Sequence, residues 1–213
     1  MSIRKELSKS LVLDKCWNDN LISIVGDEMK KYQIIYADPP WRQSKGGLRK
    51  ARPNQLRGLD YPTLSLPDIK EILLKLDAPI LFVWTIDKFL HETEEMLSSY
   101  NLHARFVWDK ENGVAPAFTV RYAHEYLLWF YKSPMVKISP EMRGKYTTVL
   151  REKSTKHSRK PDFARKMIES LYPNLERIEL FAREKTPGWD VWGNEVDSDI
   201  ELANSTEIVK KEE

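Results

Sequence analysis

The chain has 213 residues, of which 41% are hydrophobic, and its formal net charge is +2 at pH 7. This is enough for one well-buried domain, whereas no apolar run approaches the roughly 20 residues that a membrane span needs. Without a signal-peptide pattern, with one cysteine and with four scattered histidines, the sequence predicts a cytoplasmic protein that has no disulfide, no metal site and no membrane contact.

Strand and helix patterns alternate along most of the chain. Mixed polarity predicts a helical lead-in over residues 1–30, and the apolar run 33–37 predicts a buried strand that ends at Asp38. Residues 42–60 are interpreted as a loop, after which Ser65 is expected to cap a helix. The remaining pattern predicts strands over 79–84, 105–108, 125–131 and 177–181, helices over about 87–100 and from Pro161 onward, and a polar tail over 198–213.

This alternation favours an α/β fold with a mainly parallel sheet and helices on both faces. We place one domain over residues 31–197, between the lead-in 1–30 and the tail 198–213. Ligands of such folds bind beyond the carboxyl ends of the strands. Asp38 follows the first predicted strand and Arg183 follows the last, so both are expected at the same edge of the sheet.

Basic residues are concentrated in two segments. Residues 42–59 hold six Lys and Arg and no acid, and residues 132–160 hold nine against two acids. Two cationic segments of this kind indicate a polyanionic partner at a local surface. On charge alone, a pair of solvated loops explains them equally well.

The turn Asp38-Pro39-Pro40-Trp41 has the groups needed to activate the N6 amine of adenine. This amine is a poor nucleophile because its lone pair is delocalised, and acceptors for its two N–H bonds localise that pair. The Asp38 carboxylate and the Pro39 carbonyl can accept these bonds, because proline has no competing N–H. Trp41 offers a surface on which an extruded base can stack. The alternative is an ordinary turn followed by a core tryptophan.

Six ordered blocks resemble the MT-A family of adenine-N6 methyltransferases. They cover residues 32–41, 61–65, 81–84, 124–128, 157–162 and 179–195. The resemblance implies a Rossmann-like class I methyltransferase fold in permuted order, in which the catalytic turn precedes the cofactor strand. It also implies S-adenosyl-L-methionine as the cofactor, with Asp38 beside its sulfonium. The implied cofactor-binding residues are Asp38, Ser158, Lys160, Phe181, Arg183, Asn194 and Glu195.

The resemblance also implies a nucleic-acid partner, because the family counterparts of the basic segments 42–59 and 132–160 border the substrate cleft. We therefore expect both segments to hold phosphates. The expected contact residues are Arg42, Arg49, Lys50, Arg52, Tyr61 and Lys110. DNA is favoured over RNA, because small members without targeting modules are similar to the bacterial and phage type.

Several alternatives stay open on the sequence. RNA is the alternative substrate, and an inactive nucleic-acid-binding partner subunit is the alternative function, although such partners lose the acidic turn that is intact at Asp38. Lys185-Thr186 departs from the family pattern, so no role is assigned to Lys185. The sequence leaves both a homodimer and a heterodimer open.

Overall fold

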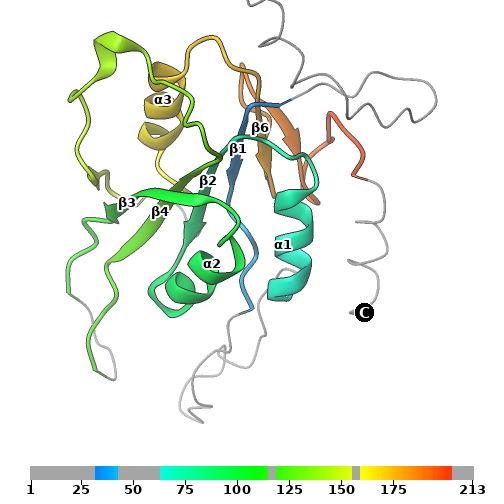
Figure 1. Ribbon diagram of the computed structural model, residues 1–213. Helices are drawn as coiled ribbons and strands as arrows, with labels where there is room; N and C mark the ends of the chain where they lie inside the picture. Colours follow the sequence, from blue (N-terminus) through cyan, green and yellow to red (C-terminus); the bar gives the residue numbers. More distant parts are fainter. Residues whose placement is uncertain (1–31, 43–62, 115–118, 155–158, 203–213) are drawn as a thin grey trace, which may run out of the picture. The chain divides into compact units, whose positions relative to one another are not determined.

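The structure, a computed structural model, describes residues 32–42, 63–114, 119–154 and 159–202. These residues form a seven-stranded sheet in the order β5-β3-β4-β2-β1-β6-β7 (Figure 1). The strands are β1 (Ile34–Ala37), β2 (Ile80–Thr85), β3 (Asn101–Asp109), β4 (His124–Tyr131), β5 (Val149–Arg151), β6 (Arg177–Leu180) and β7 (Asp190–Trp192). The helices are α1 (Leu66–Leu74), α2 (Leu90–Met96) and α3 (Asp162–Leu171), with short 3-10 turns η1 (Asp87–Phe89) and η2 (Pro140–Met142).

The sheet is mainly parallel, as predicted. Only β4 runs against its neighbours β2 and β3, and the other four pairs of adjacent strands are parallel. The alternating strand and helix pattern therefore gave the correct α/β class. The predicted lead-in 1–30 lies outside the described residues. Within the described part of the chain, no helix is long and apolar enough to cross a membrane.

Alternate side chains of the central strands are buried on opposite faces of the sheet. Ile35 and Ala37 of β1 join the cluster that holds α1 and α2, whereas Ile34 and Tyr36 join the cluster that holds α3. Successive side chains of a strand point to opposite faces, so a strand covered on both sides must be apolar throughout. This explains why the run 33–37 has no polar alternation.

The first helix follows its sequence signals closely. Ser65 accepts a hydrogen bond from the main-chain N–H of Asp68 at 3.4 Å, and Pro67 lies in the first turn, where no partner for an N–H is needed. Ile69, Ile72 and Leu73 are buried against the sheet.

Four elements differ from the sequence prediction. The predicted helix 87–100 is only η1 followed by the seven-residue α2, and β3 begins at Asn101 instead of Arg105. The short strands β5 and β7 were not predicted, since three residues are too few to show a period. Both are recognisable only by their pairing with β3 and β6.

The described chain also continues in packed structure beyond the predicted domain boundary at residue 197. Asp199 accepts a hydrogen bond from the Val191 N–H at 2.9 Å, and Ser198 accepts one from the Gly193 N–H at 3.1 Å. Leu202 is buried in the core cluster of α1 and α2. Residues 198–202 therefore hold the edge strand β7 in place.

The strand directions bring the ends of most strands to one edge of the sheet, which we call the carboxyl edge. The strands β1, β2, β3, β5, β6 and β7 all end there, and β4 begins there. Ligands of open α/β sheets bind at this edge.

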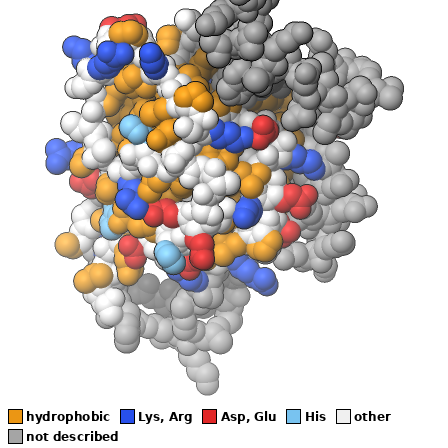
Figure 2. Space-filling model, in the orientation of Figure 1, with side chains coloured by type: hydrophobic (Ala, Val, Ile, Leu, Met, Phe, Trp, Pro, Cys, Tyr) orange, Lys and Arg blue, Asp and Glu red, His pale blue; other side chains and the backbone are white. Residues whose placement is uncertain are grey.

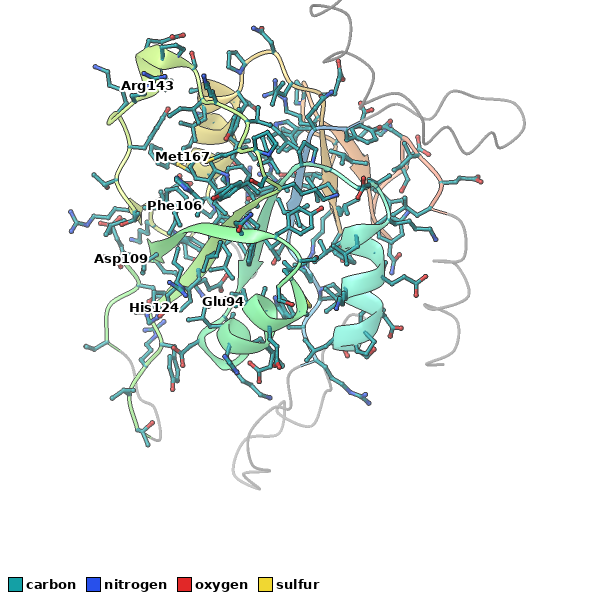
Figure 3. All side chains as sticks on the ribbon, viewed as in Figure 1. Glu94, Phe106, Asp109, His124, Arg143 and Met167 are labelled. Atoms are coloured by element: carbon teal, nitrogen blue, oxygen red, sulfur yellow. The ribbon has the colours of Figure 1, made fainter. Side chains whose placement is uncertain are left out.

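The structure divides the basic segment 132–160, contrary to our expectation that all of it borders the site. β4 ends at the opposite edge, where the Lys132 N–H donates to the Pro79 carbonyl at 2.8 Å. The chain then passes the C-terminal end of α3, where the Ser139 N–H donates to the Leu171 carbonyl. In Figure 3, Arg143 lies well away from Asp109, the last residue of β3, and from His124, the first residue of β4. Figure 2 shows basic side chains gathered near the top of the view, on the side where Arg143 lies in Figure 3. Only the part that follows β5 returns to the carboxyl edge.

Candidate active site

The Asp38 turn leaves β1 at the carboxyl edge and is held by main-chain hydrogen bonds. The Trp41 N–H donates to the Pro39 carbonyl at 2.9 Å, and the Leu64 N–H donates to the Pro40 carbonyl at 3.0 Å. A carbonyl oxygen has two lone pairs, so the Pro39 oxygen retains the capacity to accept a second bond. The two prolines therefore present carbonyl oxygens and no N–H donor of their own.

Trp41 occupies a core position. Its ring stacks on Phe89 with centroids 5.4 Å apart, its indole N–H donates to the Trp84 carbonyl at 3.2 Å, and only 4% of the residue is exposed. This arrangement favours a structural role that anchors the turn over the base-stacking role expected from the sequence.

Asp38 belongs to a cluster of four charged side chains. Lys160 Nζ lies 2.7 Å from Asp38 Oδ2 and 3.2 Å from Glu125 Oε2, and Lys110 donates to Glu125 Oε1. The side chains of Lys160, Glu125 and Asp38 are 11%, 14% and 21% exposed, so the cluster is largely shielded from water. Lys160 Nζ also lies 5.7 Å from the centre of the Trp84 ring. We call Asp38, Lys110, Glu125 and Lys160 the charged cluster.

The carboxylates of the charged cluster differ in how well their charge is stabilised. Burial raises the pKa of Asp38 above its ordinary value, and the Lys160 ammonium only partly opposes this. For Glu125, burial also acts to raise the pKa, but Lys160 and Lys110 together hold it below its usual range. Burial acts to lower the pKa of Lys160, yet Asp38 and Glu125 outweigh it and raise that pKa. The ionised Asp38 is therefore the group that another positive charge would stabilise most.

Phe181, a predicted cofactor residue, follows the strand next to β1. Ala37 pairs with Leu180 in register, so Phe181 begins the next connection along the edge from Asp38. Phe181 has φ +62°, an unfavourable backbone conformation for a bulky side chain, and its ring meets Trp192 edge to face. Such strain is found where the surrounding structure imposes a functional geometry.

Gly193 brings the two predicted cofactor segments into contact. A Cβ at this position would lie 2.1 Å from the Ala182 carbonyl oxygen, and the Ala182 N–H donates to the Trp192 carbonyl at 3.0 Å. Only glycine permits this approach. Beyond it, Arg183 Nε lies 3.6 Å from Glu195 Oε1, with both side chains partly exposed. The structure thus places Arg183 and Glu195 together, with Asn194 next to them in the chain.

A small pocket opens on the other side of Lys160. Its lining includes the basic residues Lys153, Arg159 and Lys160, the acids Glu152 and Asp162, and Trp108. The Glu152 carboxylate accepts bonds from the Asp162 and Phe163 N–H groups at the start of α3, and so fixes the helix end next to this pocket. Three cations around one opening can hold an anionic group.

Two of the remaining predicted site residues lie in the described part of the chain. Arg42 is exposed directly after the Asp38 turn, and Lys110 belongs to the charged cluster. The other predicted contacts lie outside the described residues, namely Arg49, Lys50, Arg52, Tyr61 and Ser158.

Sequence reasoning gave Glu125 no role of its own, although the residue connects Lys110 to Lys160. The one available signal was its position at the start of a predicted strand, next to His124. The buried pair Arg165 and Glu179 was also missed. Arg165 binds Glu179 through two hydrogen bonds of 2.8 and 2.7 Å and lies 5.4 Å from the centre of the Tyr36 ring. This pair supports β1 on the face opposite α1.

Comparison with known proteins agrees with this geometry. A sequence model of the MT-A70 family matches residues 32–195. The chain is 31% identical over 201 residues to the Type II methyltransferase M.MunI from Mycoplasma sp, covering 84% of each protein. It is 30% identical to the human N(6)-adenine-specific methyltransferase METTL4, over 78% of this chain and 38% of that protein. It is 28% identical to the zebrafish (Danio rerio) N(6)-adenosine-methyltransferase subunit METTL3, over 83% of this chain and 29% of that protein.

Proposed function

Because this chain belongs to the MT-A70 family of methyltransferases, we propose that it transfers a methyl group from S-adenosyl-L-methionine to the N6 amine of adenine in DNA. The observation that carries this proposal is the Asp38 carboxylate, which lies at the carboxyl edge with one oxygen bound by Lys160. Among the described residues, Asp38 Oδ1 has no hydrogen-bond partner. It is therefore available to accept an N–H bond from the adenine amine.

The chain's own groups account for the activation of the amine. Asp38 Oδ1 and the Pro39 carbonyl accept the two N–H bonds, which localises the nitrogen lone pair and directs it away from the ring. Lys160 keeps the Asp38 side chain in one orientation, and Glu125 holds Lys160 from the other side. Catalysis of this kind comes from positioning and fixed charges.

The charged residues around Asp38 and Arg183 support S-adenosyl-L-methionine as the cofactor. When bound, S-adenosyl-L-methionine supplies an electrophilic methyl group on a positive sulfur. Burial raises the pKa of Asp38 and so disfavours its charged form. A nearby cation, such as the sulfonium of the cofactor, would stabilise that charge. Arg183, Asn194 and Glu195 are proposed to hold the ribose or the methionine end, and Lys160 with the basic pocket can take the carboxylate.

The substrate is the finer part of the proposal. The similarity to METTL4, named as adenine-specific, and to METTL3, named as an adenosine methyltransferase, supports adenine N6 as the target. DNA is favoured by the resemblance to compact bacterial-type relatives, and RNA is the second candidate. The test is to incubate the protein with isotope-labelled cofactor and matched DNA and RNA, followed by nucleoside mass spectrometry. Labelled N6-methyladenine only in RNA would overturn the DNA proposal, and no labelled product in either would overturn the proposed activity.

Cofactor binding should stabilise the folded protein. At a cofactor concentration a hundredfold above the dissociation constant, we expect the melting temperature to rise by about 5 °C or more, because only the folded state binds. The Arg183→Ala variant should lose most of this shift. Arg105→Ala, which removes an exposed arginine paired with Glu94, serves as the control and should keep it. Scanning fluorimetry with S-adenosylhomocysteine measures the effect, and no shift in the wild type would contradict the cofactor assignment.

The two basic segments should contribute unequally to DNA binding. Replacing Arg49, Lys50 and Arg52 together by Ala should weaken binding and flatten the plot of log affinity against log salt by about 0.9 for each phosphate that the protein no longer neutralises. The matched control replaces Lys137, Arg143 and Lys145, exposed residues of the stretch that passes the C-terminal end of α3.

The control removes the same charge, and its salt slope should stay near the wild-type value. Fluorescence anisotropy at three salt concentrations gives both slopes. Equal effects of the two triple variants would show that overall charge controls binding, independently of any local phosphate site.

A further inference from the structure

The connection between β3 and β4 exposes apolar side chains directly beyond the charged cluster. Val114, Val120 and Tyr122 are 100%, 70% and 62% exposed, and they are the most exposed large hydrophobic residues in the described part of the chain. β3 ends at the carboxyl edge and β4 starts there, so the arms of this hairpin extend from the edge that holds the site, at the lower left of Figure 1. Exposed apolar groups gathered in one place indicate an interaction surface.

The base of the hairpin is part of the charged cluster. The Lys110 N–H donates to the Ala123 carbonyl at 3.0 Å, closing the two arms, and the Lys110 side chain binds Glu125. Glu125 in turn contacts Lys160, which holds Asp38. Asp109, the last residue of β3, pairs with His124, the first residue of β4, and Figure 3 shows the two side by side at this base.

A further contact holds the arms in position above the base. The Arg121 guanidinium donates to the carbonyl oxygens of Asn112 and Gly113 at 3.0 and 3.2 Å. It therefore ties the arm that carries Val120 and Tyr122 to the arm that carries Val114. The apolar side chains are presented from a framework that is hydrogen-bonded on both sides.

The depth of the site creates a need for such groups. The side chains of Asp38, Lys160 and Glu125 are only 21%, 11% and 14% exposed, so a stacked and paired adenine cannot bring its amine to the Asp38 carboxylate. The base must leave the duplex, and this costs unstacking and unpairing energy. Proteins that distort DNA commonly offset this cost by inserting apolar side chains where bases separate.

We propose that the β3–β4 hairpin is a wedge for duplex DNA, in which Val114, Val120 and Tyr122 fill the space that the target adenine vacates. This inference rests on the proposed function and specifies how the same site gains access to a paired base. The place of the hairpin favours DNA as the occupant, because Lys110 at its base is linked through Glu125 and Lys160 to Asp38, the residue proposed to bind the target base.

The test compares a paired with an unpaired target base. Sequencing of genomic DNA treated with the wild-type protein first identifies a methylated sequence. Two duplexes of that sequence are then prepared, one native and one with an abasic site opposite the target adenine. The triple variant Val114→Ser, Val120→Ser, Tyr122→Ser should methylate the native duplex about tenfold more slowly than the wild type, and the abasic duplex at nearly the wild-type rate.

The control is Val149→Ser, which makes the same change at an exposed apolar residue of β5. Unchanged melting temperature and unchanged stabilisation by S-adenosylhomocysteine show that the triple variant is folded. An equal reduction of the rate on both duplexes, or an unchanged rate on the native one, overturns the wedge. So does a change from dimer to monomer in sedimentation, which would make the apolar residues an interface between copies. A wild type that methylates no DNA overturns the proposed function instead.

Discussion

The Asp38→Ala variant should lose methyl transfer by about a thousandfold or more, because it loses both the N6 acceptor and the charge that opposes the sulfonium. Asp38→Asn should also be strongly impaired, since the amide retains one acceptor oxygen but carries no charge. Initial rates under saturating cofactor, followed by nucleoside mass spectrometry, measure both variants.

Stability measurements separate this loss from unfolding. Burial raises the pKa of Asp38, so ionisation of this carboxyl lowers the stability of the folded state as the pH rises above the unfolded pKa, and a neutral Asn removes that cost. Lys160 keeps Glu125 as its counter-ion. The melting temperature of Asp38→Asn should therefore stay close to that of the wild type.

The matched control is Asp77→Asn. Asp77 also pairs with a lysine, Lys132, but at the opposite edge of the sheet, and its φ of +51° suits Asn. This control should keep the wild-type rate. Wild-type activity in folded Asp38→Ala would refute the mechanism.

The Arg165→Met variant should cost about 3–5 kcal/mol of unfolding free energy, because it leaves the Glu179 carboxylate buried without its partner. Glu179 is 5% exposed and receives two hydrogen bonds from Arg165. For a domain of this size, the melting temperature should fall by about 10 °C. Urea denaturation gives the free energy directly.

The pH dependence identifies the cause of this loss. Burial already raises the pKa of Glu179, and Arg165 opposes the rise, so its removal raises the pKa further. A group whose folded pKa is raised contributes its stability below the unfolded pKa and loses it as pH rises through the folded value. The defect of Arg165→Met should therefore shrink as the pH is lowered toward the ordinary carboxyl range.

A double variant provides the control. Arg165→Met with Glu179→Gln removes both charges and should recover most of the lost stability, because the large cost lies in the unpaired charge. A single variant that loses less than about 1 kcal/mol, the range of an exposed ion pair, would mean that water reaches Glu179 when Arg165 is absent.

The positions of local features could be predicted from the sequence alone. The apolar run before Asp38, the capped helix after Ser65 and the alternation of elements predicted the α/β class and placed the Asp38 turn at the end of β1. The predicted sites at Asp38 and Arg183 also fall at one edge, because parallel strands end together. These features depend on residues close together in the chain or on general rules of sheet topology.

Tertiary structure alone decided which charges meet. Lys160 contacts Asp38 across 122 residues of sequence, and Glu125 joins them only because β4 runs antiparallel and starts at the carboxyl edge. The same reversal of β4 carries Lys137 and Arg143 away from the site. In the sequence, these two residues cannot be distinguished from the basic residues that lie close to the site. A charge pattern records composition, whereas an active site depends on distances and burial, and these exist only after the strands have paired.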